Sequence, residues 1–210
     1  MSARFLDDEA RAAFARAIET IEHASAAEVV IAVRRRSHGY RHVNVAIGAL
    51  VAFAALAVMM FAEHRFSYAS ILFDPFIAGI LAGAAVELLP GVKRVLTTPA
   101  RRRQQVRVAA RATFVERGVH VTRDRTGLLV YISWLEQQVV LVADSTLAAA
   151  LPADAQAAAE AALTRAMARG GSAVAEVLAR LAPELGKSVP RRADDRNELP
   201  DAIDSDLEAR

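Results

Sequence analysis

The most prominent pattern along the chain is an uninterrupted apolar run of twenty residues, Val43 to Ala62, which contains no charged side chain. A helix of this length spans about 30 Å, the thickness of the hydrocarbon core of a bilayer. A buried helix of a soluble protein normally keeps a polar stripe, and this run has none. The run therefore predicts a transmembrane helix.

A second apolar segment runs from Ile71 to Leu89. Asp74 and Pro75 are typical of the cap and first turn of a helix, and Pro90–Gly91 is typical of a helix end. The segment predicts a second membrane helix, which returns the chain to the side from which it came. The two segments together predict a transmembrane hairpin over residues 43–89.

Small residues recur four positions apart in both segments. They are Gly48 and Ala52 in the first segment, and Gly79 and Gly83 in the second. This spacing lets two membrane helices approach each other closely, so we expect these residues to lie between the helices. The alternative is a general richness in alanine and glycine.

Basic residues are unevenly distributed around the hairpin. Those before it are Arg34, Arg35, Arg36 and Arg41, and those after it are Lys93, Arg94, Arg101, Arg102, Arg103 and Arg107. The loop between the two segments has one arginine, Arg65. Because basic flanks stay on the cytoplasmic side, we expect a protein of the inner membrane with two spanning helices and both termini in the cytoplasm. Met1 to His23 lacks the apolar region of a signal peptide, so we expect the hairpin to be retained.

Outside the hairpin, helical and strand patterns alternate. Phe5 to His23 has apolar residues at helical spacing, and the β-branched run Glu28 to Val33 predicts a buried strand. After the hairpin we expect a helix from Thr98–Pro99 to Gly118, strands at Leu128–Ser133 and Val139–Ala143, and helices at Asp154–Arg169 and Ser172–Leu185. The short connection between the last two strands predicts an antiparallel pair.

The order of these elements determines the predicted fold. The first strand must join the two later strands, because no single helix can cover it alone. We therefore expect an α/β fold with a small sheet flanked by helices, interrupted by the two-helix transmembrane hairpin. Residues 1–36 and 98–189 form one discontinuous soluble domain. Residues 190–210 are charged and without apolar periodicity, which predicts a flexible tail.

Composition excludes several classes of function. The chain has no cysteine, which excludes disulfides, thiolate metal sites and cysteine nucleophiles. The net charge is only +2, so no global basic field attracts nucleic acid, and no nucleic-acid partner is expected.

Three stretches of the chain are similar to a known family. They are IETIEHASAAEVVIAV (18–33), RATFVERGVHVTRDRTGLLVYISWLEQQVVLVAD (111–144) and PRRADDRNELPD (190–201). Together they resemble the TPM domain family, named in part for proteins of the plant thylakoid. The last stretch resembles the end of a bacterial membrane branch in which a hydrophobic hairpin interrupts the domain. The resemblance covers most of residues 5–201 and implies a TPM-like α/β sandwich.

The resemblance implies less about function. Plant relatives are described as acid phosphatases in photosystem repair, and an animal relative is an accessory subunit of a membrane receptor. Glu28 stands where the family has the acidic residue that opens its first strand, and Asp144 stands where a later strand ends with an aspartate. The bacterial branch commonly has a tryptophan near the position of Gln156, which this chain lacks. This chain also lacks the targeting sequence of the lumenal relatives, so we do not expect it to share their compartment.

Three carboxylates near predicted strand ends are candidate metal ligands: Glu28, Asp124 and Asp144. Oxygen ligands suit a hard divalent cation, which could activate water for phosphate hydrolysis. The alternative is structural, with Glu28 capping a strand and the two aspartates forming turns. We assign no catalytic residue and no other cofactor, because the chain has no G-x-S-x-G, Walker A or H-E-x-x-H motif.

A cluster of arginines follows the second apolar segment: Arg101, Arg102, Arg103 and Arg107. Basic residues this close to a membrane helix meet anionic headgroups, with a gain of about 1 kcal/mol each. We therefore expect a membrane-surface role for this cluster. Binding of phosphorylated ligands is the alternative.

These observations favour a membrane-tethered, cytoplasmic-facing α/β module with an interaction or scaffolding role. The expected partners are the lipid bilayer and another membrane or cytoplasmic protein, and an oligomer is compatible with the pattern. The sequence favours a protein without enzymatic activity. The alternative is a weak, metal-dependent phosphomonoesterase.

Overall fold

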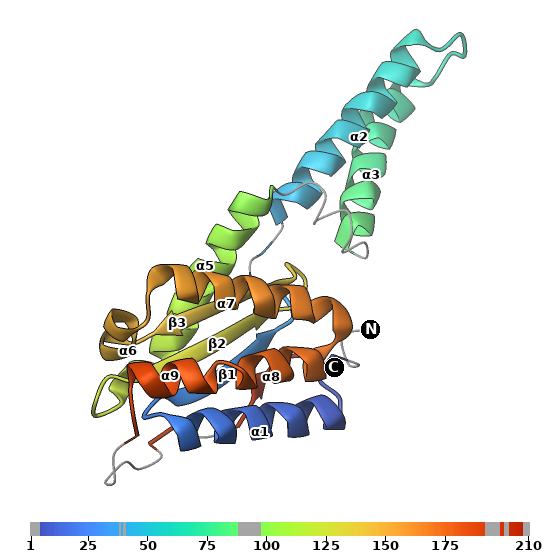
Figure 1. The fold of residues 1–210 in the computed structure, drawn as a ribbon. Helices are drawn as coiled ribbons and strands as arrows, with labels where there is room; N and C mark the ends of the chain where they lie inside the picture. The colour runs from blue at the N-terminus through green and yellow to red at the C-terminus, as the bar shows by residue number, and fades with distance from the viewer. Residues whose placement is uncertain are drawn as a thin grey trace. The chain divides into compact units, whose positions relative to one another are not determined.

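The computed structural model describes residues 5–37, 39, 41–87, 98–191, 198–199 and 202–207. The chain forms two compact units, one of Met1–Ser37 with Arg103–Arg210 and one of His38–Arg102. The predicted fold class is confirmed, because the first unit has a four-stranded sheet with helices around it, and the second has two long apolar helices (Figure 1).

The sheet has the strand order β3-β2-β1-β4. The strands are β1 (Glu28–Arg34), β2 (Gly127–Ser133), β3 (Gln138–Ala143) and β4 (Asp204–Ser205). β1 pairs in parallel with β2, with Val30 opposite Leu129, and β2 pairs with β3 in the antiparallel direction. The first strand therefore joins the two later strands in one sheet, as predicted.

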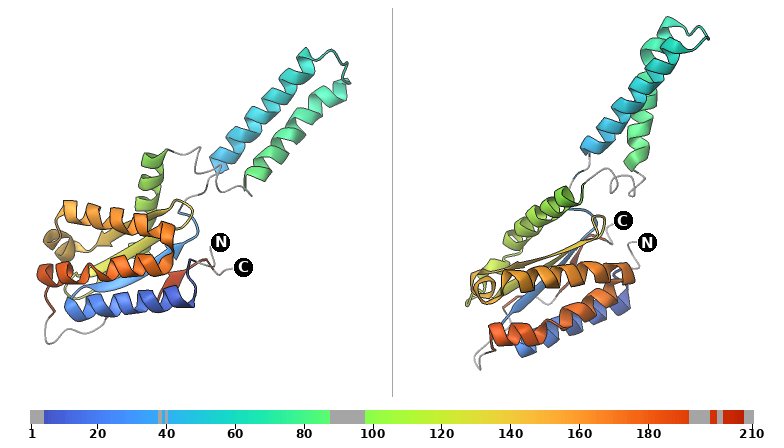
Figure 2. Two further views of the ribbon diagram at one scale, coloured as in Figure 1. Left: turned by 45° about the vertical axis from the view of Figure 1, so that its right-hand side comes forward. Right: turned by 45° about the horizontal axis from the view of Figure 1, so that its top comes forward.

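Both faces of the central strands are buried, which explains their continuous apolar sequence. Val29, Ile31 and Val33 point to one face, and Val30 and Ala32 point to the other. The first face is covered by α1 (Asp8–Ala24), α7 (Ala153–Ala166), α8 (Gly171–Ala179) and α9 (Ala182–Ser188), and the second by α5 (Pro99–Glu116) (Figure 2).

The N-terminal helix α1 shows how local sequence sets these contacts. The Asp7 carboxylate caps the helix by accepting a hydrogen bond from the Ala10 backbone N–H at 2.9 Å. Phe14, Ile18 and Ile21 then recur on one side and are fully buried in the core. The predicted amphipathic helix is therefore confirmed.

The second alanine-rich helix differs from the prediction because it divides into α8 and α9. Pro183 lies in the first turn of α9. Its ring would clash with the carbonyl group of Ala179 in a continuous helix, and it has no N–H to donate. A further short helix, α6 (Ser145–Ala150), was not predicted and starts directly after Asp144.

Part of the C-terminal segment returns to the sheet, in contrast to the predicted flexible tail. β4 pairs in parallel with β1, with Asp204 opposite Ala32. The Asp204 carboxylate forms ion pairs with the guanidinium groups of Arg34 and Arg117. Burial acts to lower the pKa of Arg34, but the hydrogen bond and charge of Asp204 prevail and hold this pKa above its ordinary value. A strand of two residues is too short to produce a recognisable sequence pattern, and residues 192–197, 200–201 and 208–210 lie outside the described part of the chain.

Side chains of α7 cover the outer edge of β3. Thr164 accepts a hydrogen bond from the Val139 backbone N–H, and Glu160 accepts one from the Leu141 N–H, both at 3.0 Å. Gln156 donates to the Leu141 carbonyl oxygen at 2.8 Å. These three polar residues, spaced four apart on one side of α7, occupy hydrogen-bonding groups that an exposed edge strand would offer to another chain.

The second unit consists of α2 (Arg41–Phe61) and α3 (Tyr68–Glu87). Both helices are long and apolar enough to cross a membrane. α3 starts earlier than predicted, because the Ser67 hydroxyl accepts a hydrogen bond from the Ser70 N–H at 3.1 Å and caps the helix, and Pro75 lies inside it. The predicted stop at Pro90–Gly91 and the basic residues Lys93 and Arg94 lie outside the described residues.

Candidate functional site

The contact between α2 and α3 depends on glycine. A Cβ atom on Gly48 would lie 2.7 Å from the carbonyl oxygen of Gly79, and one on Gly79 would lie 2.6 Å from that of Gly48. A Cβ atom on Gly83 would lie 3.0 Å from the carbonyl oxygen of Asn44. The Cβ atom added to Gly79 would also lie 2.9 Å from the Cβ atom of Ala52. The small residues predicted to lie between the helices are found there, and they allow the two backbones to touch.

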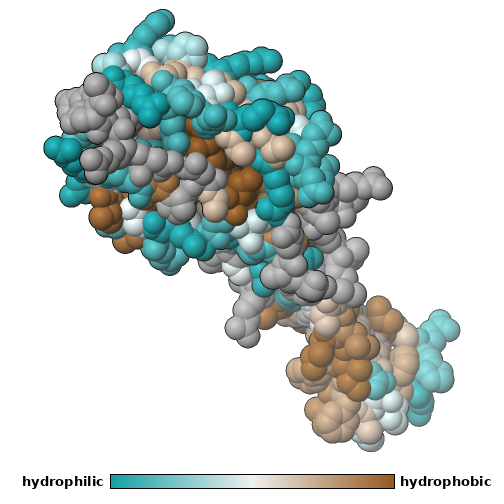
Figure 3. Space-filling view, turned by 90° about the horizontal axis from the view of Figure 1, so that it is seen from below, coloured by the Kyte–Doolittle hydropathy of each residue, from teal (hydrophilic) through white to brown (hydrophobic). Residues whose placement is uncertain are grey.

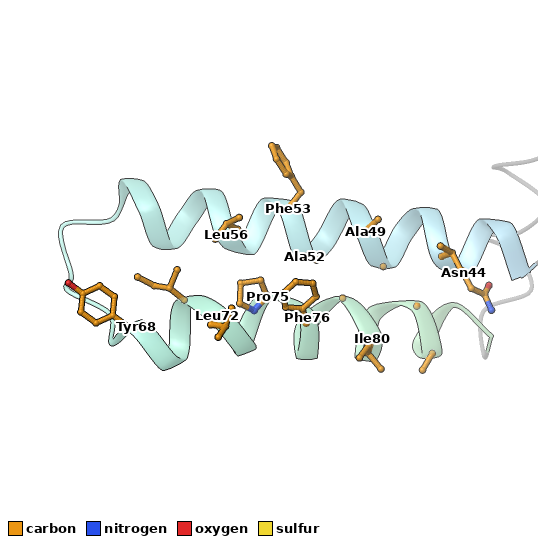
Figure 4. A pocket seen from close by; sticks show the side chains of 16 residues that line it. Asn44, Ala49, Ala52, Phe53, Leu56, Tyr68, Leu72, Pro75, Phe76 and Ile80 are labelled. Atoms are coloured by element: carbon orange, nitrogen blue, oxygen red, sulfur yellow. The ribbon is translucent and has the colours of Figure 1, made fainter.

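An apolar groove of about 1180 Å³ also runs between the two helices (Figure 4). Leu56, Leu72 and Phe76 are among the residues that line it. The hairpin also exposes apolar side chains elsewhere, and Val58 and Phe61 are 65% and 86% exposed. Figure 3 shows a largely hydrophobic surface on this unit, in brown. Exposing apolar surface to water costs about 25 cal/mol per Å², so this unit suits a hydrocarbon environment.

A cluster of hydrogen-bonded side chains lies where β1 and β2 end. The Ser37 hydroxyl lies 2.7 Å from the Ser133 hydroxyl and 3.3 Å from the Tyr131 hydroxyl. The Glu136 carboxylate accepts a hydrogen bond from the Ser133 hydroxyl, and both of its oxygens lie 3.3 Å from the Ser37 backbone nitrogen. Glu136 is only 1% exposed. We call these four residues the Glu136 cluster.

The Glu136 cluster holds the chain at the point where it leaves the sheet toward the hairpin. Backbone hydrogen bonds extend the β1–β2 pairing, from Trp134 to Arg34 at 2.9 Å and from Leu135 to Arg35 at 3.0 Å. Ser37 follows within the cluster, and α2 begins four residues later. Sequence reasoning missed this cluster, and the available signal was an acidic residue in a short connection between two apolar strands.

The Tyr131 hydroxyl gives the cluster a testable dependence on pH. Burial raises its pKa above the ordinary value, while the Ser37 hydrogen bond and the charge of Arg34 oppose this. As pH rises, the Tyr131 hydroxyl therefore loses its proton in the unfolded chain before it does so in the folded chain. The contribution of Tyr131 to stability is complete below about pH 10 and is lost above it.

We expect the melting temperature of the full chain to fall more steeply above pH 10 than that of Tyr131→Phe. Trp134 fluorescence during heating measures both slopes, and equal slopes would contradict the assignment.

The predicted metal ligand Glu28 has a partner within the chain. It is buried at the start of β1, and its carboxylate accepts hydrogen bonds from the backbone N–H groups of Glu198 at 3.2 Å and Leu199 at 3.3 Å. Glu28 thus connects the C-terminal segment to the sheet.

The other two predicted ligands differ in their surroundings. Asp144 caps α6 by accepting a hydrogen bond from the Ser145 N–H at 2.6 Å, and its second oxygen lies 3.8 Å from the Arg125 guanidinium. Asp124 is exposed in the loop before β2. The register places Glu28 and Asp144 at the same end of the sheet, on either side of Gly127. Within the described ranges, no three His, Cys, Asp or Glu side chains come together as a group that could hold a metal ion.

The four arginines of the predicted membrane-surface cluster differ in their surroundings. Arg101 and Arg103 are exposed on α5, and Arg102 is half-buried. Arg107 forms an ion pair with Glu160 of α7 at 3.1 Å. Arg107 therefore also helps to join α5 to α7.

Comparison with known proteins supports the fold. No model of a known protein family matches the chain, and no curated protein matches it. The NMR structure of the BA42 protein from the psychrophilic bacterium Bizionia argentinensis is similar, with a TM-score of 0.57 and 14% sequence identity over 96% of this chain and 95% of that chain. At this identity the likeness shows a shared fold alone, and membership of the TPM family stays a prediction.

Proposed function

We propose that the protein is a membrane-tethered α/β module that faces the cytoplasm and binds another protein there. The observation that carries the proposal is the position of the apolar hairpin within the chain. The hairpin starts after β1 and ends before α5, and these two elements pack in one core through Val30 and Ala110. Two chain connections, one on each side of the hairpin, therefore tether a single folded domain.

The buried carboxylates support a binding role over hydrolysis. Glu28, Glu136 and Asp144 each accept hydrogen bonds from backbone N–H groups of other residues in the chain. Such contacts fix loops and the C-terminal segment in place, which gives a rigid surface for a partner. The basic flanks of the hairpin favour the cytoplasmic side for that surface.

The proposal is tested by cross-linking the tagged full chain in intact cells and separating the solubilised complexes by size. We expect a complex with a second, different protein at a constant ratio. The complex should persist when residues 43–86 are exchanged for an unrelated two-helix hairpin, because the α/β unit makes the contact. A chain that migrates only with copies of itself would contradict the proposal.

Topology provides the control for this experiment. The chain has no cysteine, so His64→Cys in the hairpin loop and Ala15→Cys on α1 each introduce a single thiol. A membrane-impermeant maleimide applied to spheroplasts should label the loop thiol, and it should label the α1 thiol only after permeabilisation. The reverse pattern would place the domain outside the cytoplasm.

A further inference from the structure

The surface of the α/β unit has few large apolar side chains in contact with solvent. Among the described residues of this unit, the exposed ones are Val108, Val115 and Val121, at 61%, 61% and 69%. Val108 and Val115 lie on α5 seven positions apart, or about two turns, so they share one side of the helix. The opposite side packs on the sheet through Val106 and Ala110, both completely buried.

The side of α5 that carries these valines is also basic. Its exposed residues recur at alternating spacings of three and four: Arg101, Gln104, Val108, Arg111 and Val115. We call these five residues the α5 outer face. Arg107 is different, because its guanidinium is paired with Glu160. The α5 outer face combines arginines with apolar side chains, and the one acidic residue of α5, the exposed Glu116, lies at the end of the helix next to Val115.

A helix surface of this composition suits the boundary between water and a bilayer. We propose that the α5 outer face docks on anionic lipid headgroups at the inner surface of the membrane. The arginines are attracted to the anionic surface, and the valines enter the headgroup region beside them. This inference rests on the proposed membrane tether and adds a second, reversible attachment to it.

Chain connectivity favours a bilayer over a separate protein as the occupant. α3 ends at Glu87 and α5 begins at Pro99. A connection of this length spans at most about 40 Å even when fully extended. If α3 crosses the membrane, the first turn of α5 stays near the surface at a high effective concentration, so weak lipid contacts are sufficient.

The test uses the purified full chain in nanodiscs of phosphatidylcholine, with or without phosphatidylglycerol. A single thiol from Val108→Cys carries a fluorophore, and a quencher is attached to the lipid headgroup. We expect strong quenching in the anionic nanodiscs and several-fold less in the neutral ones. Added Arg101→Gln and Arg111→Gln substitutions, or high salt, should remove the difference, because both weaken attraction to anionic lipid. A fluorophore at Ala15→Cys, on the opposite face of the sheet, should stay unquenched.

A hairpin position separates failure of this inference from failure of the tether. A fluorophore at Phe53→Cys should be quenched by acyl-chain quenchers in both kinds of nanodisc. If Phe53→Cys is quenched and Val108→Cys is not, the tether stands and the lipid-docking inference is overturned. Protection of Val108→Cys in native membranes but not in nanodiscs would assign the face to a protein partner instead. An unquenched Phe53→Cys would overturn the tether itself.

Discussion

Replacing Glu136 by leucine is expected to lower the melting temperature of the α/β unit by on the order of 10 °C. Leucine fills a similar volume but accepts no hydrogen bond. The Ser133 hydroxyl, which is completely buried, and the Ser37 N–H, which is half-buried, now donate to the Glu136 carboxylate. Both would then be left without this acceptor. Each such group costs about 1–3 kcal/mol, so we expect a loss of about 3 kcal/mol in the free energy of unfolding. Trp134, two residues away, reports the transition by its fluorescence.

Two further variants separate this effect from changes in size or charge. Glu136→Gln keeps one acceptor oxygen and should lose clearly less stability than Glu136→Leu. Glu176→Leu removes an exposed carboxylate from α8 and should change the free energy of unfolding by less than about 0.5 kcal/mol. If Glu136→Leu is as stable as the unaltered chain, the Glu136 cluster does not stabilise the end of the sheet.

Replacing Gly79 by leucine is expected to separate the two helices of the hairpin. The new Cβ atom would lie 2.6 Å from the Gly48 carbonyl oxygen and 2.9 Å from the Ala52 Cβ atom. A carbonyl oxygen within a helix cannot rotate away as a flexible side chain can, so one helix must move. Overpacking of this kind costs about 1–3 kcal/mol of helix association. Spin labels at Val45→Cys and Ile80→Cys, both on exposed positions, measure the separation in nanodiscs.

We expect the distance between these labels to become longer and more broadly distributed in Gly79→Leu. Ala54→Leu adds the same side chain at an exposed position of α2 and should leave the distance unchanged. A distance unaltered by Gly79→Leu would mean that the glycine contact does not determine how the two helices pack.

The features that the sequence predicted well are those with a repeating pattern. The apolar run after Val43, the β-branched run after Glu28 and the paired strands near Leu129 each extend over several residues, and neighbouring positions support the same conclusion. The small residues around Gly48 were recognisable because membrane helices pack through such residues at this spacing. The sheet was predictable because the first strand has to pair with other strands, and the two later strands were recognisable in the sequence.

The features that it missed depend on single residues or distant contacts. Ser67 caps α3 ahead of the more conspicuous Asp74, and Pro183 divides a helix whose apolar pattern continues. Strand β4 pairs with β1, and its Asp204 forms ion pairs with arginines far away in the sequence. The burial of Glu136 depends on Ser37, which precedes the hairpin. None of these features produces a repeating pattern of apolar and polar residues in the sequence around it.

The interrupted sheet imposes an order on biosynthesis. β1 leaves the ribosome before the hairpin, but its neighbour β2 follows only about ninety residues later, which at usual elongation rates takes about 5 to 20 s. During this interval both apolar helices have already been made and are available to the insertion machinery. The sheet of the α/β unit cannot form until β2 has been made. If the hairpin inserts into a bilayer, as we propose, it can therefore do so before a folded domain exists. β4 follows β3 and the helices α6 to α9 in the chain, so its pairing with β1 completes the sheet only after all of these elements have been made.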